Sequence, residues 1–383
     1  GDWQSGLRDG AGVAMATFCH GTTEELWYMP RLDTLLNGQS SPTAGGENRE
    51  GNVNVLVLGR GDLKSLISMD EAIGLMKNAF QELSAGRAVV PLRTVIDVEP
   101  GTSSTLVMPA YLPGLNALGF KVISIFTRNP ERGLPTGNAM VCMLDEETGA
   151  PVALLNGAFL TALRTGAVSG AATDLLARPD ARVLTIIGAG VQGATQALAV
   201  CAVREIEKIN VVRRSDASWH RFEALVERDW PELLPRMTGT TDVEAAVREA
   251  DVICAATTSG TPVFEDAWVQ PGTHINGVGS FTPETREIPG ETIVRARVVV
   301  DHRESALSEG GDLIIPLNEG LIGLDHIVAE LGEVVAGDIP GRTTADEITF
   351  FKSVGNAVQD VVTARRAIEL ATARGVGQEI SLD

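Results

Sequence analysis

Cysteine is scarce in this sequence, and its spacing excludes two kinds of site. Four cysteines occur in 383 residues, and none belongs to a C-x-x-C pair. A disulfide framework or a zinc site would need paired cysteines, so we expect neither, and no bound metal. Scattered thiols of this kind are typical of a reduced, cytoplasmic protein. The four residues are Cys19, Cys142, Cys201 and Cys254.

Basic charge is also in short supply. Lysine and arginine number 31 against 50 aspartates and glutamates, which gives a formal net charge of −19. Nucleic acids and anionic membranes are bound through basic surfaces, so we expect neither of them as a partner. An anionic small molecule would need a local cluster of cations that acts against the field of the whole protein.

Long apolar runs are missing as well. No run approaches the roughly 20 residues that span a bilayer. The first residues do not show the charged and then apolar pattern of a signal peptide. Residues 1–52 form an N-terminal extension that ends in a stretch rich in Gly, Ser and Asn, 37–52. This composition predicts a weakly ordered linker.

Among the features that are present, a glycine motif points first to a dinucleotide. Residues 183–187 predict a short buried strand. Gly188, Gly190 and Gly193 follow in G-x-G-x-x-G spacing, and an Ala- and Leu-rich helix comes next. Gly188 allows a tight turn, Gly190 lets the backbone approach a pyrophosphate, and Gly193 lets helix and strand pack closely. The alternative is a glycine-rich turn that binds nothing.

The order of strands and helices predicts an α/β protein with two domains. From residue 181 onward strands alternate with helices, which indicates a Rossmann-type doubly wound parallel sheet over 175–354. Before it, strands follow one another without helices between them, which indicates an antiparallel or mixed sheet in an α+β domain over 53–174. The strands expected are 55–58, 89–98, 105–110, 118–126, 140–144, 183–187, 209–213, 252–256, 274–278, 298–301 and 347–351.

Two arginines and a serine stand where the adenosine ribose is expected. An NAD site usually has Asp or Glu at the end of the second Rossmann strand, whereas this chain has Arg213, Arg214 and Ser215. Guanidinium groups pair well with a 2′-phosphate, so we expect NADP(H) to be preferred. Asp216, one residue further on, keeps NAD(H) open, and a solvated basic turn is the remaining alternative.

Small residues follow two further strands of the same sheet. Strand 252–256 leads into Thr257, and strand 274–278 leads through Val278 into Gly279. Ligands bind at the carboxyl ends of strands in open α/β sheets. We therefore expect these residues to form a wall against which a nicotinamide lies flat.

Three cations in the first domain lie in apolar surroundings. Arg93 follows Val90-Pro91-Leu92, Lys121 stands between Phe120 and Val122, and Arg164 lies in a helix among Ala, Leu and Gly. A charge in such a place is costly unless it is paired. Each could pair with a structural carboxylate. Three of them in one domain of an acidic protein also suggest a site for a substrate carboxylate.

Six blocks in order resemble the ornithine cyclodeaminase/mu-crystallin family. They spread over residues 54–375, nearly the whole chain apart from the extension, and together they are much more specific than the glycine motif alone. The blocks are 90–94, 119–121, 133–139, 163–167, 188–193 and 351–355.

The resemblance implies a division of labour between the domains. It implies that 53–174 and 355–383 form a domain for substrate binding and dimerisation, so that the protein is a homodimer. By the same likeness, Arg93, Lys121 and Arg164 contact the substrate carboxylate. It further implies cofactor contacts from Thr136, from Val191 and Gln192 in the pyrophosphate turn, from Arg214, and from Ser353 and Val354 beside the nicotinamide.

One departure from the family pattern bears on the reaction. The family's cyclodeaminases carry a working Asp where this chain has Phe281, and a phenyl ring cannot take up a proton. The resemblance is therefore nearer to the reductases and amino-acid dehydrogenases of the family. We expect an NAD(P)H-dependent oxidoreductase that acts on the C=N bond of a small imino acid, such as a ketimine or Δ1-pyrroline-2-carboxylate.

In that reaction Arg93 and Arg164 would hold the carboxylate and Lys121 would handle the imine proton. Three alternatives stay open. One is an alanine-dehydrogenase-like enzyme that makes an amino acid from a keto acid and ammonia. Another is a cyclodeaminase that uses a different residue for the missing Asp. The third is a mu-crystallin-like protein that binds NADPH and a small ligand without catalysis.

Overall fold

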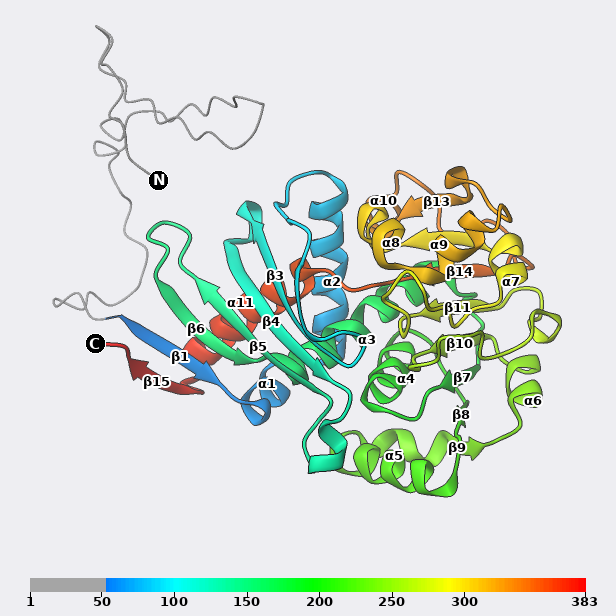
Figure 1. Ribbon diagram of the computed structural model, residues 1–383, viewed down its shortest axis with the longest axis horizontal. Helices are drawn as coiled ribbons and strands as arrows, with labels where there is room; N and C mark the ends of the chain where they lie inside the picture. Colours follow the sequence, from blue (N-terminus) through cyan, green and yellow to red (C-terminus); the bar gives the residue numbers. More distant parts are fainter. Residues whose placement is uncertain (1–52) are drawn as a thin grey trace, which may run out of the picture. The chain divides into compact units, whose positions relative to one another are not determined.

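The computed structural model describes residues 53–383, and the extension predicted to be weakly ordered, 1–52, lies outside the described residues. The described chain forms two β-sheets, each with its own helices, joined through a long buried helix (Figure 1). The predicted fold class, a doubly wound parallel sheet plus an α+β part, is confirmed. The exact domain boundaries stay a prediction.

The first sheet is mixed, as its run of consecutive strands predicts. Strands β2 to β6 pair antiparallel in sequence order, β1 joins β6 in parallel, and β15 closes the far edge. Two of these strands, β6 and β15, were missed by the sequence analysis. The strands are β1 Asn54–Leu58, β2 Thr94–Glu99, β3 Ser103–Leu112, β4 Ala117–Phe126, β5 Gly137–Leu144, β6 Pro151–Asn156 and β15 Gln378–Ser381.

The expected strand 89–98 needs a correction. Regular pairing begins only at Thr94, and Val89 makes an isolated bridge to Tyr111. Pro91 lies between them, and because proline has no N–H group it cannot donate to a strand ladder. Arg93 therefore stands on the irregular segment just before β2, where its side chain is free to turn away from the sheet.

Helices cover the first sheet on one side. The C-terminal helix α11, Ala357–Arg374, packs against β3, β4 and β5, so the chain returns to the first sheet after the second is complete (Figure 1). Helix α2, Met69–Ser84, packs beside it, and Ser68 caps that helix by accepting from the Glu71 N–H at 3.2 Å. The short helix α1, Arg60–Leu66, precedes α2 in the chain.

The second sheet has eight strands in the order β13-β12-β14-β11-β10-β7-β8-β9, and every pair is parallel. Strands β9 and β13 were not predicted. The last strand, β14, inserts between β11 and β12. The strands are β7 Val183–Ile187, β8 Lys208–Val212, β9 Met237–Thr240, β10 Val252–Ala255, β11 His274–Gly277, β12 Arg297–Val300, β13 Ile327–Glu330 and β14 Thr349–Lys352.

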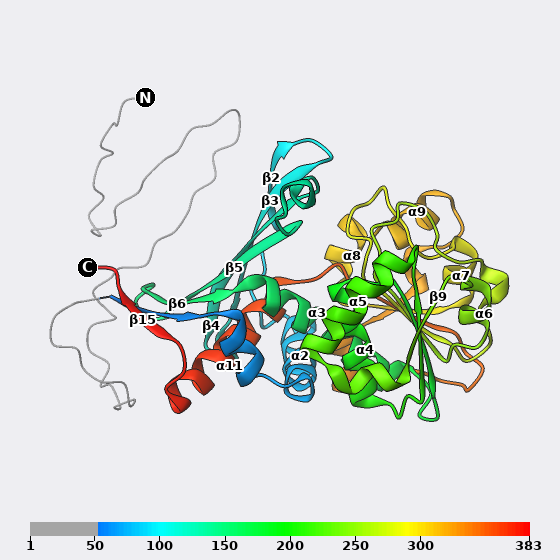
Figure 2. The same ribbon diagram turned by 90° about the horizontal axis from the view of Figure 1, so that it is seen from below.

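Helices lie on both faces of this sheet, with α4 and α5 on one face and α6 and α7 on the other (Figure 2). None of the helices in 53–383 has the length and hydrophobicity that a bilayer crossing needs. Helix α6 is capped by Asp242, whose side chain accepts from the Ala245 N–H. The helices are α4 Val191–Val203, α5 Asp216–Asp229, α6 Val243–Arg248, α7 Gly290–Arg295, α8 Arg303–Glu309, α9 Gly311–Asn318 and α10 Leu331–Ala336.

Helix α3, Gly157–Leu176, joins the two sheets and is almost entirely buried. It packs against α2 and β5 on one side and against α4 and β11 on the other. Glycine makes the closest of these contacts possible. A Cβ atom at Gly166 would lie 2.5 Å from the carbonyl oxygen of Thr195 on α4.

We expect Gly166→Ala to lower the free energy of unfolding by about 1–3 kcal/mol, because two helix backbones would have to move apart. Gly74→Ala is the matched control. Gly74 is exposed on α2 with no atom within 4 Å of a built Cβ, so alanine there should stabilise the protein by about 0.5–1 kcal/mol. Urea unfolding of both variants measures the two effects. Equal stabilities would contradict the tight α3–α4 contact.

Candidate active site

Two adjoining cavities lie at the carboxyl edge of the parallel sheet. The first, of about 530 Å³, is bordered by the glycine turn and the end of β8, and we call it the turn cavity. The second, of about 270 Å³, lies between that edge and the elements β3, β4 and α3, and we call it the cation cavity. Both are lined by Ala256, Thr257 and Thr258, so a long ligand could extend from one into the other.

The glycine turn has the form that a pyrophosphate requires. Gly188 has a φ of +120°, and a side chain there would collide with the carbonyl oxygen of Ala256. A side chain at Gly193 would collide with Gly188 itself, whereas Gly190 faces open space. Helix α4 begins at Val191, followed by Gln192, without a side-chain cap. Its first N–H groups are therefore available to an anion.

The far end of the turn cavity is basic. Arg213 and Arg214 both line it, and Arg213 pairs with Asp216. Ser215 does not line the cavity. Its hydroxyl caps α5 by accepting from the Ser218 N–H at 3.2 Å. Ser218 and Arg221 on α5 line the cavity as well, and the sequence analysis did not select either of them.

The structure brings the three singled-out cations to one place. Arg93 before β2, Lys121 on β4 and Arg164 on α3 all line the cation cavity. Ser353 and Val354 after β14, Val278 and Gly279 after β11, and Gln192 on α4 line it too. Thr136, in the loop between β4 and β5, is exposed and lines neither cavity.

A buried carboxylate that the sequence analysis missed joins two of the cations. Asp360 on α11 accepts a hydrogen bond from Lys121 Nζ at 2.6 Å and another from Arg164 Nε at 3.1 Å. The side chains of Lys121 and Asp360 are 1% and 0% exposed. A signal was available, because Asp360 is a lone acid between the core residues Val358 and Val361 of an amphipathic helix.

The structure confirms that the cations pair with carboxylates, and their role in binding a substrate carboxylate stays a prediction. Each has a carboxylate partner, yet each keeps donors to spare. Within residues 53–383, Arg164 Nη2 and the Nε and Nη1 atoms of Arg93 make no hydrogen bond, and Lys121 Nζ makes one. Unused guanidinium donors beside a cavity are suited to an incoming carboxylate.

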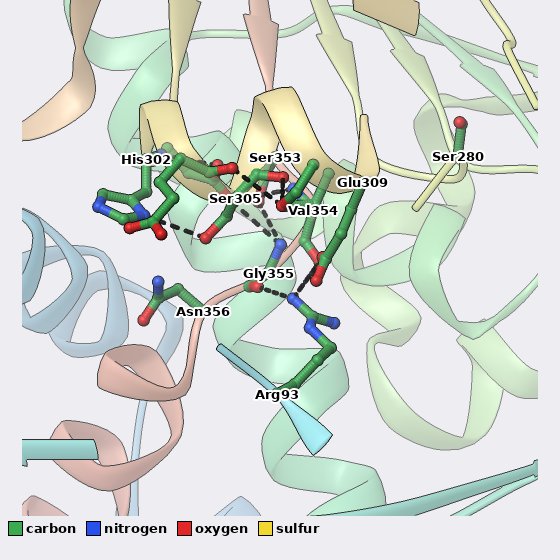
Figure 3. Close-up of polar contacts among 12 residues, drawn as sticks. Arg93, Ser280, His302, Ser305, Glu309, Ser353, Val354, Gly355 and Asn356 are labelled. Atoms are coloured by element: carbon green, nitrogen blue, oxygen red, sulfur yellow. Dashed lines mark hydrogen bonds and ion pairs between the residues drawn. The ribbon is translucent and has the colours of Figure 1, made fainter. Parts of the chain in front are cut away.

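The Arg93 side chain is held from the second sheet (Figure 3). Its Nη2 atom donates to the Gly355 carbonyl oxygen at 2.6 Å and lies 2.9 Å from a carboxylate oxygen of Glu309. The loop that carries Gly355 is fixed by buried Asp301, which accepts from the Ser353 hydroxyl at 2.7 Å and from two backbone N–H groups. Gly355 has a φ of +80°, and a side chain there would press against Arg164.

The surroundings of Lys121 bring its pKa close to neutral pH. Burial, and then the charge of Arg164, lower the pKa of Lys121 to about 7, against the opposing effect of Asp360. A lysine with such a pKa can give up or accept a proton at neutral pH. Burial likewise lowers the pKa of Arg93 and raises that of Glu309.

A second buried network supports the wall beside the cavities. Glu287 accepts backbone hydrogen bonds from Thr257 at 2.6 Å and from Gly279 at 2.7 Å, so one carboxylate ties together the loops after β10 and β11. Asp312 in turn accepts from the Glu287 N–H at 2.7 Å and from Lys352 Nζ at 2.6 Å. The small residues predicted to form the wall are thus held by acids that the sequence analysis did not select.

A sequence model of the ornithine cyclodeaminase/mu-crystallin family matches residues 53–374. The chain belongs to this family. The resemblance carried by the six sequence blocks is thereby confirmed.

Three relatives within the family are informative. Delta(1)-pyrroline-2-carboxylate reductase of Bacillus cereus is 41% identical over 327 residues, 85% of this chain and 99% of the relative. The structure of the Thermococcus litoralis enzyme of that name, in complex with NADH and L-proline, aligns with a TM-score of 0.81 and 44% identity over 85% of this chain and 100% of that one. An archaeal alanine dehydrogenase dimer with bound NAD aligns with a TM-score of 0.79 and 33% identity, over 86% and 100% of the two chains.

The carboxylate of Asp360, shared by two cations, leads to a prediction about stability. Asp360→Asn keeps the shape of the side chain but leaves buried Arg164 without its counter-charge and favours loss of the proton from Lys121. We expect it to lower the free energy of unfolding by about 3–5 kcal/mol. Adding Lys121→Met should recover part of the loss, because the buried amine that has lost its partner is then replaced by an apolar side chain. Urea unfolding measures both variants, and wild-type stability of Asp360→Asn would contradict this account.

Proposed function

We propose that the chain is an NADPH-dependent reductase of the C=N bond of a small imino acid, with Δ1-pyrroline-2-carboxylate or a similar cyclic ketimine as substrate. One observation carries the proposal. Three cations with spare donors line a cavity that adjoins a dinucleotide-type glycine turn. A carboxylate held by these donors would lie next to the place where a nicotinamide is expected. Relatives named for the same reaction support it.

The residues present fit a dinucleotide. Gly188, Gly190 and the uncapped start of α4 would hold the pyrophosphate, and Arg213 and Arg214 a 2′-phosphate. Thr257, Gly279 and Val354 would border the nicotinamide. When bound, NADPH supplies the hydride. NAD(H) is the alternative cofactor, because the solved relatives are complexes with NADH and NAD.

The cation cavity then has two tasks. The free donors of Arg93 and Arg164 would bind the substrate carboxylate and so fix the position of the imine carbon. Lys121, with its pKa near 7, would donate the proton that the imine nitrogen takes up. Leu106, Met108 and other apolar side chains line the cavity. They would exclude water and so protect the imine from hydrolysis.

The alternatives differ in what they ask of the cavity. An alanine-dehydrogenase-like enzyme would form the same kind of imine from a keto acid and ammonia, and the same cations would serve it. A cyclodeaminase needs a carboxylate beside the substrate amine, whereas Phe281 lines the cavity. A non-enzymatic binder has no need for a lysine whose pKa lies near 7.

We also propose a homodimer built on the first sheet. Strand β2 is exposed along its whole length, and Val95, Ile96 and Val98 are each more than half exposed. An apolar strand of this kind is suited to cover by a second copy. The archaeal relative described as a dimer agrees with this.

Purified protein tests the reaction directly. We expect NADPH oxidation with Δ1-pyrroline-2-carboxylate and with its six-membered analogue, at rates well above those with pyruvate and ammonia. The opposite ranking would favour an amino-acid dehydrogenase. Ornithine consumption with release of ammonia would favour a cyclodeaminase. Tight NADPH binding with no turnover of any substrate would favour a non-enzymatic protein that binds NADPH and a small ligand.

The pH dependence tests Lys121. Its pKa is lowered to about 7, so the protonated donor is present below pH 7 and is lost above it. We expect kcat/KM for the imine to fall about tenfold per pH unit above this value. A bound carboxylate favours the charged lysine, so the limb in kcat should lie at higher pH. Lys121→Met should lower kcat and remove the limb, and an unchanged profile in that variant would reject the proton-donor role.

Cofactor choice tests Arg214. We expect wild-type protein to have a higher kcat/KM with NADPH than with NADH, and Arg214→Ala to lose most of that preference. A charge-assisted contact to the 2′-phosphate would account for about a tenfold to hundredfold difference. Arg221 lines the same turn cavity, so Arg221→Ala shows how much of the preference for NADPH comes from Arg221. Equal efficiency of the two cofactors in wild type would overturn the choice of NADPH.

A further inference from the structure

Glu309 is an acid beside the cavity that we propose to bind a substrate carboxylate. It ends helix α8, and its oxygen lies 2.9 Å from Arg93 Nη2 (Figure 3). The side chain is only 18% exposed. That oxygen has no hydrogen-bond partner among residues 53–383, so the contact is charge pairing alone. Glu309 thus acts on Arg93 mainly through its charge.

The fixed acids nearly balance the fixed bases of the cation cavity. Lys121 and Arg164 share Asp360, and Arg93 faces Glu309. The donors left free by these pairs are enough for one carboxylate. No lysine or arginine beyond these three lines the cation cavity in the described part of the chain.

The rest of the surroundings is unfavourable to a second negative charge. The cation cavity is walled by Leu106, Met108, Ile123 and Ile125. Past Phe281 it adjoins a third cavity of about 420 Å³, which Arg93, Leu106 and Ile125 also line. The charged residues on the third cavity besides Arg93 are Asp97 and Glu309. Beyond its first carboxylate a substrate therefore meets apolar side chains, neutral hydroxyl groups and the acids Asp97 and Glu309, but no further lysine or arginine among the described residues.

We propose that Glu309 is a specificity-determining residue that restricts the site to imino acids with a single carboxylate. The proposal rests on the proposed function, since it concerns the substrate of that site. A second carboxylate on the ligand would approach Glu309 at the Arg93 end of the cation cavity, where the third cavity that Glu309 lines begins. Two neighbouring carboxylates repel each other strongly where little water separates them. Glu309 also reduces the attraction that Arg93 could offer to a doubly charged ligand.

Two matched ligands isolate charge from size. Pyrrole-2,5-dicarboxylate and 5-carbamoylpyrrole-2-carboxylate have the same shape, but only the first has a second negative charge. Calorimetric titration into wild-type protein saturated with NADP⁺ should show the carbamoyl compound binding about tenfold tighter or more. In Glu309→Gln this ratio should fall about tenfold, mainly because the dicarboxylate binds better.

Glu304→Gln is the control variant. Glu304 is exposed on the same helix and makes no ion pair within residues 53–383, so it has the same change in charge without contact to Arg93. Its affinity ratio should match wild type. If Glu309→Gln does not fold, Glu309→Ala at the same helix end replaces it. Kinetics with an imine of oxaloacetate and methylamine should show the same gain in the Glu309 variants.

Three results would decide against the inference. It fails if the two ligands bind wild-type protein equally, if the ratio is unchanged in both Glu309 variants, or if Glu304→Gln changes the ratio as much. Each of these failures can occur in a protein that reduces Δ1-pyrroline-2-carboxylate normally. Absence of imine reduction in wild type would instead remove the proposed function, and this inference with it.

Discussion

The carboxylate of Asp360 is the contact on which the site depends. It lies on α11 and binds a lysine from β4 and an arginine from α3, so three elements from distant parts of the chain meet at one buried acid. Without it, two positive charges would face each other in an apolar interior, which is strongly unfavourable. The same contact leaves other donors of both cations unused. The ion pairs that stabilise the fold therefore also orient these donors toward the cavity.

Much of the architecture was readable from local pattern. The glycine turn with its flanking strand and helix and the alternation that makes a parallel sheet follow from spacing within short windows. The cations Arg93, Lys121 and Arg164 stood out because charge is rare in apolar segments. In each case the signal is carried by neighbours in sequence, and the structure keeps those neighbours together.

The rest depends on partners distant in sequence. Nothing near Lys121 indicates that its counter-charge lies 239 residues away. Nothing near Thr257 indicates that its loop is tied by Glu287, because acids on loops usually face solvent. The edge strands β9 and β15 are four residues long and mostly polar, so they lack the apolar run that marks the equally short, buried strand β10. Pro91 ends the ladder before Arg93, and so moves this residue from a strand into a loop.

The chain path has a consequence for how the protein is made. The ribosome produces Lys121 and Arg164 early, then the whole parallel sheet, and only afterwards α11 with Asp360. During that interval the first sheet lacks both its covering helix and the acid that neutralises its buried bases. A nascent chain would therefore expose apolar strands and unpaired cations together, which is the state that chaperones bind and that aggregates most readily. Synthesis of the last helix converts this vulnerable intermediate into the finished pocket.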